Sequence, residues 1–144
     1  MKAGVDTIEH GAPLTDELLR LFKKNGLGNA SSLTCTLSPA LPFAVLSPEK
    51  THSTHVQKVN GRVVYEGVAT ATRQALANGI PVGLGTDSAC PFVTHYDMWR
   101  EVVYFQRHTG VTPEFALHTA TLKNAQLLGV ANETGSIETG KSAD

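Results

Sequence analysis

Two polar residues at the ends of predicted strand segments are the first candidates for chemistry in this sequence. His10 ends the run 5–10, and Asp87 follows the apolar run 80–85 after a single threonine. Neutral imidazole is the most common protein ligand for zinc, and a carboxylate serves as a metal ligand or as a general base. A carboxylate that leaves a buried strand is costly unless it is paired or metal-bound. The two residues therefore predict a metal or acid–base site at strand ends.

Both residues also have a purely structural interpretation, which the sequence leaves open. His10 would then bond to a backbone carbonyl at the end of its strand, and Asp87 would order its own loop through Thr86 and Ser88. A third interpretation assigns the Gly-Leu-Gly sequence at 83–85 to a bound phosphate. The full Gly-x-Gly-x-x-Gly spacing is absent, however, and the nearby acid would repel an anion.

Three further histidines and one cysteine are weaker candidates. His95 follows Asp87 by eight positions, close enough to line the same pocket, and Cys90 lies between them. Since no histidine pairs with Cys90 in the sequence, a thiol nucleophile is not favoured. His95 and Cys90 are instead weaker candidates for contact with a substrate. His52 and His55, three positions apart, could hold a metal or simply belong to a polar surface.

Apolar periodicity predicts that alternating strands and helices carry these residues. The expected strands are 5–10, 32–37 and 80–85, and the third is apolar throughout, as in a parallel strand buried on both faces. Repetition of strand and helix predicts an α/β fold with a parallel sheet and right-handed crossovers. Three strands are too few to close a barrel.

The expected helices have a cap or an apolar stripe at helical spacing. They are a helix capped by Thr15 that stops at Gly26, one with the stripe Val64, Val68, Ala71 and Ala75, one over 97–107, one that starts at Thr112-Pro113, and a separate short one from Thr121 to Leu128. In the third helix, Trp99 and Phe105 are expected in the core. The stretch 39–59 lacks periodicity and is expected to be a long loop with at most a short helix.

Composition limits the class of protein. The chain has 144 residues with 12 basic and 13 acidic side chains, so no net charge attracts nucleic acid or an anionic membrane. No apolar run reaches the ~20 residues of a membrane span, and the first residues do not form a signal peptide. Because two cysteines, Cys35 and Cys90, make no disulfide framework, we expect a reduced, cytoplasmic setting.

Several motifs together carry a resemblance that covers nearly the whole chain. They are Gly4-Val5-Asp6-Thr7-Ile8-Glu9-His10-Gly11, Gly83-Leu84-Gly85-Thr86-Asp87-Ser88, Ala116-Leu117 with Ala120-Thr121, Asn124-Ala125, Leu128-Gly129 and the tail Gly135–Asp144. This ordered set resembles the metal-dependent amidohydrolase superfamily, in the branch of prolidase-like and imidazolonepropionase-related enzymes. The resemblance implies part of a (β/α)8 barrel of TIM type, with its site at the carboxyl ends of the strands.

The resemblance also implies roles for individual residues. His10 corresponds to the metal-binding histidine that ends the sixth barrel strand, Asp87 to the metal-binding aspartate that ends the eighth, and 32–37 to the seventh strand. The family's His-x-His pair, its bridging carboxylated lysine or acid and its fifth-strand histidine have no counterpart here. Residues 1–144 are therefore expected to be the C-terminal portion of a barrel domain, truncated at both ends. The isolated segment is expected to be inactive, since two ligands hold zinc weakly.

The activity implied for the parent enzyme is hydrolysis of a C–N bond in a small molecule such as an amide, a dipeptide or a cyclic amide. A divalent metal, expected to be zinc, would activate water, and Asp87 would bind the metal and accept the proton of the water. His10 would bind the metal or hold the carbonyl oxygen. Two alternatives stay open: a non-catalytic fragment that forms homo-oligomers through exposed barrel edges, and an anion-binding module.

Overall fold

Three short parallel strands form the sheet that organises the fold. The computed structural model describes residues 5–24 and 31–142. The strands pair in the order β1 (Thr7–Glu9), β2 (Ser32–Cys35) and β3 (Val82–Leu84). Ile8 lies beside Leu33, which in turn lies beside Val82. The expected α/β alternation and parallel sheet are confirmed, although each strand is shorter than the run that predicted it.

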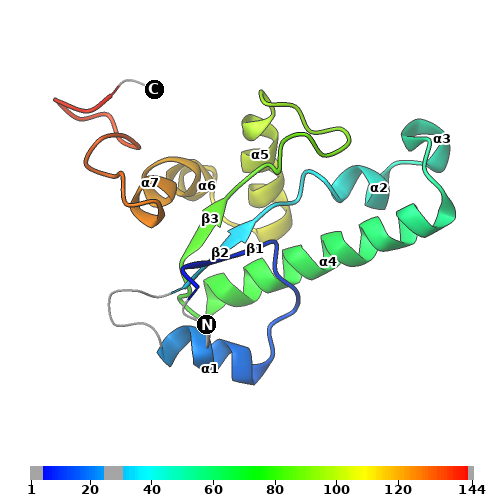
Figure 1. Ribbon diagram of the computed structural model, residues 1–144, viewed down its shortest axis with the longest axis horizontal. Helices are drawn as coiled ribbons and strands as arrows, with labels where there is room; N and C mark the ends of the chain where they lie inside the picture. The colour runs from blue at the N-terminus through cyan, green and yellow to red at the C-terminus, as the bar shows by residue number, and fades with distance from the viewer. Residues whose placement is uncertain (1–4, 25–30, 143–144) are drawn as a thin grey trace.

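Helices connect and flank the strands (Figure 1). They are α1 (Asp16–Lys24), α2 (Leu41–Val45), α3 (Pro48–Thr51), α4 (His55–Ala77), α5 (Met98–Thr109), α6 (Pro113–His118), the π-helical turn η1 (Thr119–Lys123) and α7 (Asn124–Leu127). Figure 1 shows α4 running beside the sheet and continuing past it towards α3. Val68, Ala71 and Ala75 of the predicted stripe are buried, whereas Val64 is half-exposed. Within the described residues, no helix is long and apolar enough to cross a membrane.

The segment 39–59 is helical over much of its length, so the expected long loop is wrong. α2 and α3 each begin with a proline in the first turn, where its missing N–H costs no hydrogen bond. α4 begins at His55 because Thr54 and Gln57 form a capping box. The Thr54 hydroxyl accepts from Gln57 N–H at 3.2 Å, and Gln57 Oε1 accepts from Thr54 N–H at 2.8 Å. This polar cap carries no apolar periodicity, which is why the helix start was missed.

The helical region after Thr112 is continuous, so the expected start of a separate helix at Thr121 is wrong. Thr112 caps α6 as expected by accepting from Phe115 N–H, but α6, η1 and α7 then follow without a break. The Thr121 hydroxyl donates to Leu117 O at 2.8 Å. A hydroxyl that bonds back to its own helix does not cap a new one. The expected stop at Gly26 lies outside the described residues.

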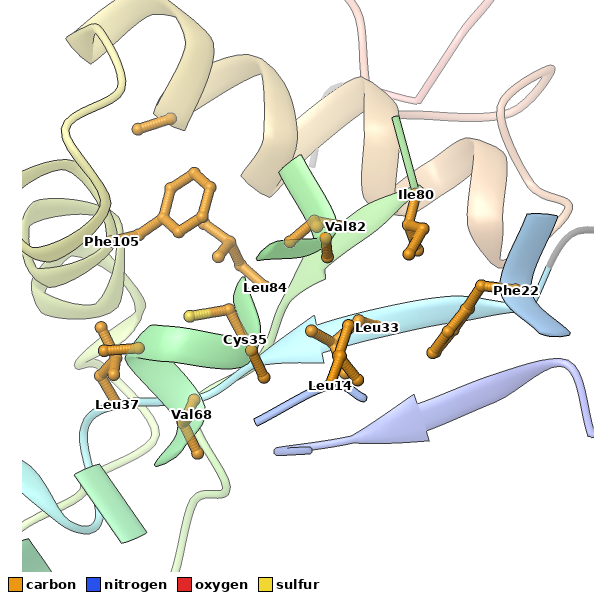
Figure 2. Close-up of a cluster of buried hydrophobic side chains, with 14 residues drawn as sticks. Leu14, Phe22, Leu33, Cys35, Leu37, Val68, Ile80, Val82, Leu84 and Phe105 are labelled. Atoms are coloured by element: carbon orange, nitrogen blue, oxygen red, sulfur yellow. The ribbon is translucent and has the colours of Figure 1, made fainter. Parts of the chain in front are cut away.

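The core lies between the sheet and the helices α4 and α5 (Figure 2). Leu33 of β2 and Val68 of α4 are completely buried, and Figure 2 shows Leu84 of β3 beside the ring of Phe105. Phe105 is buried as expected, but Trp99 is 61% exposed, so its assignment to the core is wrong. Six positions correspond to ~1.7 helical turns, which places the two side chains on different sides of α5.

The outer edge of β3 is occupied by a side chain rather than by a strand. Gly85 N–H donates to Cys35 O, so strand alternation turns the N–H and C=O of Leu84 away from β2. Asn124 bonds both groups, since its Oδ1 accepts from Leu84 N–H at 2.9 Å and its Nδ2 donates to Leu84 O at 2.8 Å. A Cβ at Gly83 would lie 2.8 Å from Asn124 Oδ1, so this approach requires glycine. Part of an edge that could pair with another chain is therefore closed.

We expect Asn124→Ala to lower the free energy of unfolding by about 1–3 kcal/mol, because the two Leu84 backbone groups lose their partner. Urea denaturation followed by circular dichroism measures the change. Gln126→Ala, at an exposed position two residues away, is the control and should change stability by less than about 0.5 kcal/mol. Equal losses in the two variants would show that water replaces the Asn124 amide without cost.

Candidate functional site

His10 and Asp87 share an uncommon backbone conformation at the ends of their strands. Their φ angles are +61° and +53°, in the left-handed region. Residues other than glycine adopt this region rarely, and often at functional sites where the surrounding structure holds them there. His10 N–H donates to Thr34 O at 3.0 Å, which fixes the turn after β1 to the neighbouring strand β2. The sheet thus holds His10 in a conformation that histidine itself disfavours.

The two side chains face each other at the carboxyl edge of the sheet. His10 Nε2 lies 3.8 Å from Asp87 Oδ2, and the two side chains are 44% and 45% exposed. Because β2 separates β1 from β3, the pair spans the end of β2. Each side chain therefore has one side towards its partner and another open to a third atom or molecule.

Cys90 contacts Asp87 directly. Its thiol donates to Asp87 Oδ2 at 3.2 Å, and this hydrogen bond, together with desolvation, raises the pKa of the thiol. A raised pKa keeps the sulfur protonated, which argues against a thiolate nucleophile. The hydroxyls of Thr86 and Ser88 bond one another at 2.9 Å. Among the described residues Asp87 bonds to Cys90 and not to these hydroxyls, so the alternative in which Asp87 orders its loop through Thr86 and Ser88 finds no support.

Three other candidate histidines form no hydrogen bond or ion pair with this pair among the described residues. His95 is exposed in the loop between β3 and α5, and no hydrogen bond or ion pair in the described part of the chain joins it to His10 or Asp87. His52 follows α3 and His55 begins α4, and both are exposed. Across residues 5–24 and 31–142, no group of three or more His, Cys, Asp or Glu side chains is arranged to hold a metal ion.

A buried carboxylate that sequence reasoning missed supports the end of β2. Glu101 in α5 is completely buried. Its Oε1 accepts from Leu37 N–H at 2.7 Å, and its Oε2 accepts from Ser38 N–H at 2.8 Å and from the Ser38 hydroxyl at 2.5 Å. Leu37 and Ser38 follow β2 at the edge that carries the His10–Asp87 pair. Helix α5 thus fixes the position of Leu37 and Ser38, the segment that follows β2 next to the candidate site.

Burial raises the pKa of Glu101, and the hydrogen bonds from Ser38 and the preceding residue offset part of that rise. The signal in the sequence is the position of Glu101 four residues before buried Phe105, on the same face of the helix.

At the start of α5, Asp97 accepts from Thr94 N–H at 2.9 Å and from its hydroxyl at 3.0 Å. Glu101 in α5 and Asp97 just before it therefore anchor the segments that follow β2 and β3.

The donor atoms of His10 and Asp87 fit a divalent cation as two of its ligands. Zinc binds imidazole nitrogen and carboxylate oxygen at ~2.0–2.2 Å, so two ligand atoms on one ion lie at most ~4.4 Å apart. The observed 3.8 Å is within that limit. Catalytic zinc usually has three protein ligands, and the described residues supply two. The pair can therefore hold part of a metal site, with further ligands supplied from elsewhere.

Comparison with known protein families assigns this chain to a family. The amidohydrolase family model matches residues 3–144, a range that includes both His10 and Asp87. The chain belongs to the amidohydrolase family. The resemblance that the sequence motifs carry is thereby confirmed.

Solved amidohydrolase relatives share this fold. A candidate prolidase from Bifidobacterium longum matches with a TM-score of 0.89 and 46% identity, over 99% of this chain and 35% of that one. A Xaa-Pro dipeptidase crystallised with methionine in its active site gives a TM-score of 0.76 and 31% identity, over 99% of this chain and 34% of that one. An imidazolonepropionase from Thermoplasma acidophilum is 36% identical over 72 residues, which are 50% of this chain and 17% of that protein. The α/β fold resembles that of amidohydrolase barrels, and the chain spans about a third of the solved relatives' length.

Proposed function

We propose that this chain supplies two metal ligands and the general base to a hydrolase that acts on a C–N bond of a small-molecule substrate. The observation that carries the proposal is the 3.8 Å approach of His10 Nε2 to Asp87 Oδ2 at the carboxyl edge of a parallel sheet. The Xaa-Pro dipeptidase relative supports a peptide bond as the bond broken. An amide, a dipeptide and a cyclic amide each contain a carbonyl C–N bond of this kind.

Each residue of the site has a distinct task in this proposal. Asp87 accepts a proton from the attacking water and transfers it to the leaving nitrogen. The Cys90 thiol donates to Asp87 Oδ2 and so keeps the carboxylate in one orientation. His10 binds the metal or holds the carbonyl oxygen of the substrate. A divalent metal, expected from the family to be zinc, would activate the water and the substrate carbonyl as a Lewis acid when bound.

Within a complete barrel, we assign β1, β2 and β3 to the sixth, seventh and eighth strands, and residues 1–144 to the C-terminal portion of the domain. The parallel order β1–β2–β3 supports this assignment, as do the positions of His10 after β1 and Asp87 after β3. We expect the isolated segment to be inactive, because its described residues bring only two candidate ligands together. His95 stays a proposed substrate contact.

A chimaeric enzyme tests the proposed function. Residues 1–144 replace the matching third of the Xaa-Pro dipeptidase, and hydrolysis of Xaa-Pro dipeptides is measured with zinc present. We expect the chimaera to be active. In its Asp87→Asn variant we expect kcat to fall by about 10²–10⁴-fold, because the general base is lost. We expect bound zinc, measured by elemental analysis, to fall in His10→Ala.

The matched control is His118→Ala, since His118 is exposed at the end of α6 and distant in sequence from both site residues. This variant should keep the activity and zinc content of the chimaera. A chimaera that folds but is inactive would contradict the proposal, as would unchanged kcat in Asp87→Asn.

A further inference from the structure

An aromatic side chain is exposed in the loop that begins at the candidate base. Phe92 is 46% exposed and has a φ of +68°. The left-handed region is strained for a bulky residue. Asp87 and Ala89 in the same loop also have positive φ, at +53° and +80°. The loop therefore tolerates unfavourable backbone conformations and leaves an apolar ring in water.

The loop that carries Phe92 is held at both ends. Cys90 N–H donates to Asp87 O at 3.2 Å, and Val93 N–H donates to Cys90 O at 3.0 Å. Val93 is buried directly after the exposed ring, and Asp97 ties the far end of the loop to α5. Phe92 thus projects from a fixed loop, five positions after Asp87.

A second aromatic ring, in helix α2, packs against Phe92. Phe43 of α2 meets Phe92 edge to face, with ring centroids 5.5 Å apart and an interplanar angle of 69°. Phe43 packs so closely on α4 that a Cβ at Gly61 would collide with it. The chain reaches α2 after the carboxyl end of β2, and it reaches the Phe92 loop after the carboxyl end of β3, so both segments follow the strand ends that carry the candidate site (Figure 1).

We propose that Phe92, supported by Phe43, determines substrate specificity by binding an apolar, preferentially aromatic, side chain of the substrate. This inference rests on the proposed function, since Asp87 would act on a bond of the same molecule. An exposed ring provides apolar area that a ligand side chain removes from water, and an aromatic ligand adds favourable ring–ring contact. Neither phenylalanine ring offers a positive charge or a conventional hydrogen-bond donor, so a carboxylate side chain finds no ion pair and no hydrogen bond at these two rings.

Binding of two small probes to the 144-residue chain tests the inference without turnover. N-acetyl-L-phenylalanine methylamide and N-acetyl-L-aspartate methylamide are titrated into ¹⁵N-labelled protein without added metal, and Kd is obtained from amide shift changes. We expect the aromatic probe to bind about tenfold more tightly, with the largest shifts in residues 87–97 and α2. In Phe92→Asn we expect this advantage to disappear while the aspartate probe binds as before. Asparagine adopts the left-handed region readily, so the loop conformation is kept.

Phe115→Ala is the matched control. Phe115 of α6 is 43% exposed and stacks on Phe105, with ring centroids 6.4 Å apart. Its loss should leave both affinities unchanged. Equal affinity for the two probes, an equal loss in Phe115→Ala, or shifts confined to other parts of the chain would overturn the inference. The two experiments separate the two proposals. If the aromatic probe binds more tightly but the chimaera does not hydrolyse dipeptides, only the proposed function is contradicted. If the chimaera hydrolyses dipeptides but the two probes bind equally, only this inference is contradicted.

Discussion

Glu101→Ala is expected to lower the free energy of unfolding by about 3 kcal/mol. The substitution removes the acceptor for Leu37 N–H, Ser38 N–H and the Ser38 hydroxyl in a completely buried position. A buried donor without a partner costs about 1–3 kcal/mol, and the hydroxyl alone can turn to another acceptor. Small domains are stable by about 5–15 kcal/mol, so the loss is a large fraction of the total. Denaturation in urea, followed by circular dichroism, measures it.

Glu66→Ala is the control, because Glu66 forms an exposed pair with Arg62 and should contribute less than about 1 kcal/mol. A loss in Glu101→Ala no greater than in Glu66→Ala would contradict the anchoring role.

Comparison with Glu101→Gln adds a pH test. Burial raises the pKa of folded Glu101 above its ordinary 4.5, so its contribution is full below pH 4.5 and is lost as pH rises through the folded value. Wild-type stability relative to Glu101→Gln should therefore fall from pH 4 to pH 8.

Gly11→Ala is expected to lower the free energy of unfolding by about 3 kcal/mol and to disturb the site. Gly11 has a φ of +77°, and a Cβ there would lie 2.7 Å from Leu33 Cδ1 and 3.5 Å from Ala71 Cβ. The left-handed backbone costs a residue with a side chain about 1–2 kcal/mol, and overpacking of a core costs about 1–3 kcal/mol. Because Gly11 follows His10 directly, relief of the clash moves the imidazole. Thermal and urea unfolding, together with the His10 ring signals in NMR spectra, measure both effects.

Gly79→Ala separates backbone strain from collision. Gly79 has a φ of +68°, but nothing lies within 4 Å of a Cβ there. It should therefore lose only about 1 kcal/mol, and the His10 signals should stay in place. If Gly11→Ala lost no more than Gly79→Ala, the contact with Leu33 would have no energetic weight. A double substitution with Leu33→Val, which removes Cδ1, should recover part of the loss from Gly11→Ala.

Much of the architecture could be predicted from local patterns. The run 80–85 is apolar throughout because β3 is buried on both faces, and Val82, Gly83 and Leu84 are all buried. Thr112 followed by proline predicted the start of α6, since a hydroxyl cap and a proline favour a first turn on their own. These features depend on neighbours in sequence, so the sequence is sufficient to show them.

Other features escaped prediction because their cause lies outside the local pattern. The first turns of α4 are polar, and its capping box rather than an apolar stripe marks where it begins. Trp99 counted as an apolar helix residue, yet the packing of α5 turns it to solvent and turns Glu101 inward. Hydrophobicity ranks Trp99 as a core residue and Glu101 as a surface residue, and the direction in which the helix packs reverses both assignments.

The same distinction between local pattern and tertiary packing applies to the candidate site. Residue types and predicted strands were enough to place His10 and Asp87 at strand ends and to show that both suit metal binding and proton transfer. The structure adds that Nε2 and Oδ2 lie 3.8 Å apart and that the Cys90 thiol donates to the carboxylate. The physical reason is that residue type follows from the sequence, whereas distance between strands depends on sheet order and register. Those depend on hydrogen bonds between segments far apart in the chain.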